Sequence, residues 1–150
     1  MTGEQSTFRL EAVHPEPDRV HEMPYAPAVR IVGVCDLLFI SGATPSPLYH
    51  QHPHVDDEHV HPHDIGEQTR RAMENIRLVL DKSGATWRDV VKITKYLTDI
   101  RDFDGLHAAL APYFAGWQPA STTLCVNQLS SPGARVELDV IVACRQQAGA

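Results

Sequence analysis

The chain has 150 residues, of which 43% are hydrophobic and 21% charged, and this length and composition favour one globular domain spanning residues 1–150. Its formal net charge is −6, with 13 basic residues scattered among 19 acidic ones, which argues against a nucleic-acid partner because phosphates are held by clustered lysines and arginines. Its longest apolar runs are a handful of residues, far short of the roughly 20 that a membrane-spanning helix needs, which argues against membrane insertion.

The pattern of residues 1–63 predicts strands followed by a long irregular segment. Residues 1–23 hold one alternating strand pattern, TFRLEAV, and a Pro-containing connector. Residues 28–34 and 37–41 predict two more strands, and Gly42 closes the second of them. Residues 43–63 are polar and irregular, with four prolines and six histidines, and predict a loop insertion.

Two helices are expected between residues 64 and 114. The first begins at Asp64, where Glu67 three residues later suggests a capping box, and it ends at Gly84. Apolar residues recur at helical spacing along it, and a second such stripe spans residues 102–114.

Three further strands complete the pattern, at residues 90–98, 121–127 and 134–143. Three strands, a helix, a strand, a helix and two strands predict an α+β fold in which both helices cover one face of a mixed sheet. The opposite face carries three apolar residues: Cys125, Ile141 and Ala143. Because an apolar face would be exposed in a single copy, we expect the chain to self-associate.

The three cysteines, Cys35, Cys125 and Cys144, are widely spaced and form no CxxC pair. This pattern is typical of a reducing compartment, and the first residues lack the apolar core of a secretory signal, so we expect a cytoplasmic protein. Cys125 could act as a nucleophile, but a buried cysteine that packs as a small apolar residue is the commoner case and the one we expect.

Several segments, in the right chain order, resemble the Rid (YjgF) family. They are Tyr25–Arg30 (YAPAVR), 38–42 (LFISG), 68–76 (QTRRAMENI), 89–94 (DVVKIT) and 132–140 (PGARVELDV). The resemblance implies a chorismate-mutase-like fold, a homotrimer and ligand clefts between subunits. It also implies hydrolysis of reactive imines or enamines to ketones and ammonia, a deaminase-type activity without a metal or organic cofactor. The family's older ribonuclease label would need a basic or aromatic platform for RNA, which this acidic chain lacks.

The resemblance also implies roles for single residues. Glu137 takes the place of the carboxylate that activates water as a general base, although a solvated strand residue beside Asp139 would look the same. Tyr25 matches the tyrosine that closes the cleft, and a packing role alone would also explain it. Ser41 and Gly42 match a wall of the cleft where glycine lets the backbone approach a ligand, although a tight turn would equally explain the glycine.

The chain departs from the family pattern at Ser121. Active members carry an arginine there, in a Pro-Ala-Arg segment, and its planar fork holds the substrate carboxylate. A serine carries no charge, so we expect an atypical substrate, which could be an uncharged molecule. The alternative is a trimer that binds a small molecule without catalysis. Thr123 lies on the same face and could line the same pocket. Arg30 and Arg135 are the nearest cations in the sequence that could replace the arginine.

The six histidines of the loop form two H-x-H-x-H runs within residues 50–63. We expect this stretch to form a flexible, polar lid over the cleft, because it lacks periodic apolar residues. The alternative is a metal site, since imidazoles with nearby carboxylates suit Zn²⁺ or Ni²⁺, and side chains at i and i+2 share one side of an extended chain.

Overall fold

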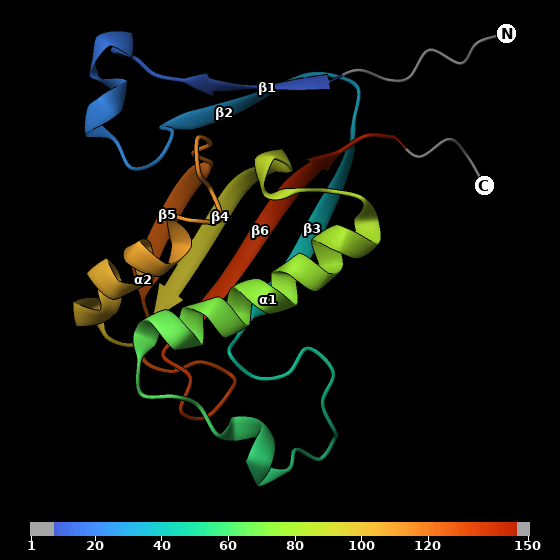
Figure 1. The fold of residues 1–150 in the computed structure, drawn as a ribbon, viewed down its shortest axis with the longest axis vertical. Coiled ribbons are helices and arrows are strands. Elements are labelled where there is room, and N and C mark those ends of the chain that lie inside the picture. Colours follow the sequence, from blue (N-terminus) through green and yellow to red (C-terminus); the bar gives the residue numbers. More distant parts are fainter. Residues whose placement is uncertain (1–7, 147–150) are drawn as a thin grey trace, which may run out of the picture.

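The computed structural model describes residues 8–146, which form two sheets and two α-helices (Figure 1). The smaller sheet is an antiparallel pair of β1 (Phe8–Val13) and β2 (Ala28–Gly33), with the 3-10 turn η1 (Pro17–Glu22) in the connector between them. These strands confirm the predictions for this part of the chain. The residues before position 8, including the first residue of the predicted strand, lie outside the described range.

The larger sheet has four strands in the order β3-β6-β4-β5. They are β3 (Asp36–Ala43), β4 (Val90–Leu97), β5 (Ala120–Cys125) and β6 (Val136–Cys144). β6 runs antiparallel to both neighbours, whereas β4 and β5 are parallel, so the sheet is mixed, as predicted. The strand ends differ from the predicted ones by a residue or two, as element ends commonly do.

The long helix α1 (Ile65–Ser83) begins and ends where the sequence predicted. Asp64 is its N-cap, and the Asp64 carboxylate accepts a hydrogen bond from the backbone N–H of Glu67 at 2.7 Å. Gly84 follows the helix with a φ of +67°, a left-handed conformation that suits a residue without a Cβ. Three short 3-10 turns complete the described elements: η2 (Asp56–His59), η3 (Trp87–Asp89) and η4 (Ile100–Asp102).

The second helix, α2 (Phe103–Leu110), is shorter than the predicted span of residues 102–114. Its last turn is closed by a hydrogen bond from the N–H of Ala111 to the carbonyl of His107 at 3.1 Å. Pro112 follows and has no N–H to donate, so the helical ladder stops and the chain continues as turns. The apolar stripe was predicted correctly, but the predicted helix length was wrong.

Both helices pack on one face of the larger sheet, and the core lies between these two layers (Figure 1). β6 contributes alternate, fully buried residues: Val136, Leu138, Val140 and Val142. The helices cover them with buried apolar side chains: Met73, Ile76, Leu80, Leu106 and Leu110. Burying one such side chain contributes about 1.5–3 kcal/mol, so burial fixes these residues of β6 towards the helices. Because side chains alternate along a strand, the residues between them point to the opposite face of the sheet.

The other face of the sheet is partly apolar and uncovered in a single copy. Leu37 and Phe39 on β3 are 50% and 69% exposed, and Leu124 on β5 is 42% exposed. Ile141 pairs with Phe39 across β6 and β3 on this face. The predicted apolar face is therefore present, with larger side chains than those read from the sequence.

Two expectations about Cys125 are wrong. Cys125 aligns with Leu97, which is fully buried under the helices, so its side chain belongs to the helix-covered face of β5. It is also exposed, because it stands at the end of an edge strand. Within residues 8–146, no helix combines the length and apolar character that a membrane span requires.

Candidate functional site

The predicted cleft wall, Ser41 and Gly42, is a β-bulge. Between two regular pairs of β3 with β6, these two residues together oppose the single residue Asp139. A bulge bends its strand and re-aims nearby side chains, and bulges are common next to functional sites. This bulge lies on the strand beside Glu137.

The Glu137 side chain occupies the space above Gly42. A Cβ placed on Gly42 would overlap Oε1 of Glu137 and would lie 2.9 Å from the carboxyl Cδ. The glycine therefore accommodates a side chain of its own chain, rather than the tight turn considered from the sequence. The structure brings Gly42 and Glu137 together.

Three ionisable groups gather on this open face of the sheet. Burial, and secondly the nearby Asp139 carboxylate, raise the pKa of Glu137. The Tyr96 hydroxyl donates a hydrogen bond to Asp139 Oδ2 at 3.1 Å, and this bond raises the pKa of Tyr96. Glu137 itself has no hydrogen-bond partner within residues 8–146, so its carboxyl is free to bind water or a ligand.

The predicted residues Tyr25 and Ser121 line a different cavity, of about 720 Å³, between the N-terminal segment and the end of α2. Much of its wall is apolar: Val20, Met23, Leu110, Phe114 and Trp117. Such a cavity, apolar with few polar groups, is typical of small-molecule sites. Thr123 shares the face of Ser121 on β5, as predicted, and it aligns with Lys95 on β4.

Lys95 and His107 meet inside this cavity. Lys95 is only 3% exposed, and its Nζ lies 3.1 Å from Nε2 of His107 on α2. Burial, reinforced by the nearby Lys92, lowers the pKa of Lys95 to about 8. Burial and the adjacent Lys95 also lower the pKa of His107. Among the residues that the structure describes, Lys95 has no carboxylate partner, so this pair can hold an anion.

Sequence reasoning gave no role to Lys95 or His107, although a signal was present. Lys95 follows the same two-residue alternation as Ile93 and Leu97, which are core residues. A lysine in the buried phase of a central strand is uncommon and favours a functional role. His107 likewise lies directly after the buried Leu106 on the apolar side of α2.

The two arginines considered as replacements for the missing family cation are engaged elsewhere. Arg135 Nε forms an ion pair with Asp102 at 2.8 Å, next to α2. Arg30 lies 3.8 Å from Glu11, its partner across the β1–β2 hairpin. The positive charge near Ser121 therefore comes from Lys95 of β4, which lines the same cavity.

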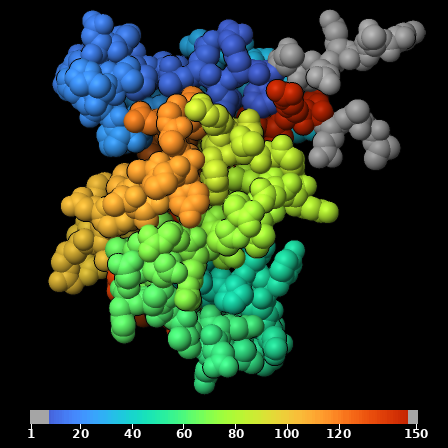
Figure 2. Space-filling model, viewed as in Figure 1, coloured from blue at the N-terminus to red at the C-terminus, as the bar shows by residue number. Residues whose placement is uncertain are grey.

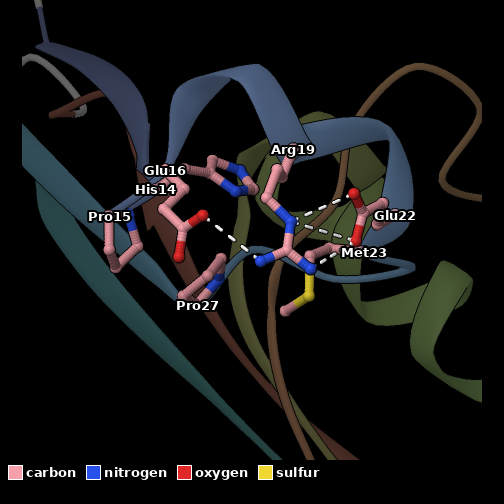
Figure 3. Close-up of a pocket in the computed structure, with 7 residues that line it drawn as sticks. All are labelled: His14, Pro15, Glu16, Arg19, Glu22, Met23 and Pro27. Atoms are coloured by element: carbon pink, nitrogen blue, oxygen red, sulfur yellow. Dashed lines mark hydrogen bonds and ion pairs between the residues drawn. The ribbon is translucent and has the colours of Figure 1, made fainter.

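A smaller cavity of about 250 Å³ lies on the connector around η1 (Figure 3). Its one guanidinium, from Arg19, donates hydrogen bonds to Glu22 at 2.7–3.1 Å and to Glu16 at 3.2 Å. These carboxylates neutralise the arginine, so the geometry indicates a brace for the turn rather than an anion site. His14 and Met23 line both this cavity and the larger one.

The histidine loop forms a third group, at the end of the molecule opposite the N-terminal hairpin (Figure 2). One ring nitrogen from each of His50, His52 and His54 lies within 4.8 Å of the others, and all three side chains are exposed. A cavity of about 310 Å³ beside them is also lined by Gly42. Among the described residues, these three histidines form a group that could hold a metal ion.

Comparison with known proteins agrees with this architecture. The family model described as endoribonuclease L-PSP matches residues 18–144. A RutC family protein of Pyrococcus abyssi is 33% identical over 108 residues, 71% of this chain and 78% of the relative. The mitochondrial protein mmf2 of Schizosaccharomyces pombe is 34% identical over 122 residues, 80% of this chain and 87% of the relative. A crystal structure of a Rid-family protein from Yersinia pestis superimposes with a TM-score of 0.62 at 32% identity, covering 80% of this chain and 87% of that one.

A four-stranded mixed sheet with both helices on one face defines the chorismate-mutase-like class of α+β fold. The chain belongs to the Rid (YjgF) family, whose sequence model covers most of its length. One relative carries a mitochondrial name, so the cytoplasmic location expected from the sequence stays a prediction.

Proposed function

We propose that this protein hydrolyses a reactive imine or enamine, or a related small metabolite, in a deaminase-type reaction at sites shared between copies of the chain. The observation that carries the proposal is the Glu137 carboxyl, which occupies the space above Gly42 and has no hydrogen-bond partner within residues 8–146. A positioned carboxyl without a fixed partner can bind and activate water.

The arrangement of the sheet supports a site shared between copies. Glu137 points away from the helices, whereas Ser121 lines a cavity on the helix-covered face, so one copy does not bring the two together. Leu37 and Phe39 leave the open face exposed and apolar, which favours burial against another copy. A homotrimer, the assembly implied by the family, would place Glu137 of one copy against the Ser121 cavity of the next.

The proposed reaction uses one water and no cofactor. Water adds to the imine carbon while Glu137 accepts one of its protons. Glu137 passes this proton to the imine nitrogen, which gives a carbinolamine. Glu137 then takes the proton of the carbinolamine hydroxyl as the carbonyl forms, and delivers it to the nitrogen as the C–N bond breaks. Imine and water thus give ketone and ammonia. A pKa above the ordinary value suits a carboxyl that both accepts and returns a proton.

Ser121 and Lys95 shape the substrate preference. Ser121 offers a hydrogen bond but no charge, which removes the carboxylate clamp that the family arginine provides. Lys95, hydrogen-bonded to His107, supplies positive charge inside an apolar cavity. We therefore expect a small substrate with an apolar body and a weakly held anionic group, and slow turnover of imines derived from common amino acids.

Ammonia release from imines generated in solution from leucine or serine tests the proposal. Ser121→Arg should increase the rate on these imines. In that background Glu137→Gln should lower the rate by about 10²-fold or more, the usual contribution of a general base. Glu74→Gln, which changes an exposed carboxylate on α1, is the matched control and should retain the rate of Ser121→Arg. If Ser121→Arg works equally well with and without Glu137→Gln, Glu137 is not the base.

A non-catalytic small-molecule-binding trimer is the second candidate. The observation that favours it is Lys95, which has no carboxylate partner among the described residues and lies in a cavity that lacks the family arginine. This arrangement can hold an anion without chemistry. Saturable binding of an organic anion that is never consumed, and that Lys95→Met weakens, would support this alternative.

A further inference from the structure

We propose that the loop of residues 43–63 contains a binding site for one divalent transition-metal ion of the zinc or nickel type, with His50, His52 and His54 as ligands. This inference is independent of the proposed hydrolysis. The sequence favoured a simple lid over a metal site, and the geometry of the loop reverses that preference.

The three imidazoles already converge. Their ring centroids lie 4.6–5.0 Å apart, and one nitrogen of each falls within 4.8 Å of the others. Zinc–nitrogen bonds of 2.0–2.1 Å require ligand nitrogens about 3.4 Å apart in a tetrahedral site. All three side chains are exposed, so small rotations of free rings are enough to close that difference.

The loop is held in this shape by contacts that need no metal. The Glu58 carboxylate accepts hydrogen bonds from the backbone N–H of Gln51 at 3.0 Å and of Val55 at 3.5 Å. These bonds join the two ends of the stretch that carries the three ligands, and they lower the pKa of Glu58. The resulting carboxylate also places negative charge beside the imidazoles, which favours a cation.

His59 is the best placed fourth ligand. Its ring lies 5.1 Å from that of His54, and its Nδ1 is 3.3 Å from Oγ of Ser131. A histidine whose other nitrogen is oriented by a hydroxyl is a common metal ligand. His61 has a different role, because its Nε2 lies 3.0 Å from the same serine oxygen and fastens the loop to the segment before β6.

The site would also connect the loop to the Glu137 bulge. The histidines share a cavity with Gly42, and the Glu137 carboxyl occupies the space above that glycine. A bound ion would therefore hold the loop over this cavity in one conformation. The ion is expected to fix the conformation of the loop and to take no part in the reaction.

Calorimetric titration of the purified full-length chain with ZnCl₂ tests the site. Wild type should bind one ion per chain with submicromolar affinity, and the double variant His52→Ala, His54→Ala should bind at least about 100-fold more weakly. His63→Ala is the matched control, since this exposed histidine of the same loop lies outside the cluster; it should keep the wild-type affinity.

Circular dichroism of each variant confirms that the fold is intact, and His50→Gln provides a second, milder change that should also weaken binding. Weak uptake at several sites in wild type, or equal binding by wild type and the double variant, would overturn the proposal and leave the loop as a metal-free lid. An equal loss in His63→Ala would overturn the assignment of the ligands.

Discussion

At the level of single residues, two glycines are present for different physical reasons. Gly42 is required by space rather than by backbone conformation, because its absent Cβ makes room for Glu137. Gly84 is the opposite case, since it has open space around it but a φ of +67°. The two glycines therefore separate an effect on the site from an effect on folding.

Gly42→Ala should displace the Glu137 carboxyl and lower imine hydrolysis about as far as Glu137→Gln does. Gly84→Ala should cost about 1 kcal/mol of stability, because alanine is strained in the left-handed region, and it should leave the rate unchanged. Steady-state rates and thermal melts of the two variants check this. Full activity in Gly42→Ala would show that the position of Glu137 does not matter.

Lys95 is expected to reduce stability at neutral pH. Its pKa is about 8 in the folded chain, against 10.5 as its ordinary value, so folding disfavours the charged form. The unfolded chain then binds more protons between these values, and the free energy of unfolding should increase as pH rises from about 8 towards 10.5. The ionisable groups around Lys95 include His107, Lys92 and Tyr25.

Lys95→Met should therefore raise the free energy of unfolding at pH 7, by about 1–3 kcal/mol, because it removes a buried charge without an anionic partner. The advantage over wild type should shrink above pH 8. Urea denaturation of both proteins from pH 6 to pH 10 measures it, and the difference between them cancels the other titrating groups. A destabilised variant at pH 7 would mean that Lys95 is paired or needed for packing.

At the level of elements, the periodic spacing of apolar residues predicted the helices and strands well. The prediction of their lengths was less accurate where a single residue interrupts the pattern. α1 was bounded correctly because its cap Asp64 and its terminal Gly84 are local signals. α2 was predicted too long because a single proline inside an apolar stripe overrides the stripe. The bulge of β3 and the burial of Lys95 depend on neighbouring strands and on α2, which are distant in sequence. The residues of the candidate site were found through family resemblance, but their division between two faces of the sheet needed the structure.

The histidine loop is attached to the core at its ends, so its middle should be removable. Asn75 on α1 donates hydrogen bonds to the carbonyls of Thr44 at 3.1 Å and Ser46 at 2.7 Å, and Ser46 and Ser131 hydroxyls lie 2.5 Å apart. Replacing residues 49–59 with a short Gly-Ser linker should leave oligomeric state and melting behaviour close to wild type while changing substrate preference. Loss of the folded assembly would show that the loop is structural.

At the level of the whole molecule, the exposed apolar face together with the family resemblance predicts a homotrimer. Leu37, Phe39 and Leu124 would remain solvated in a single copy, and burial of such a patch favours association. Light scattering at low micromolar concentration should give a mass near three times the 16.6 kDa of one chain. Phe39→Asp, at the most exposed of the three residues, should shift the mass towards one chain. A wild-type mass near 16.6 kDa would contradict the trimer.

We propose that Glu137 of one copy and the Ser121 cavity of another form one site. Activity complementation between variants of the two residues is the decisive measurement. Glu137→Gln removes the base, and Ser121→Trp obstructs the part of the cavity next to residue 121, so each variant alone should lose most of its activity. Trimers refolded from an equal mixture of the two should recover about a quarter of wild-type hydrolysis, because random assembly pairs an intact carboxyl with an intact cavity at that share of interfaces. No recovery from mixed trimers would contradict a site shared between subunits.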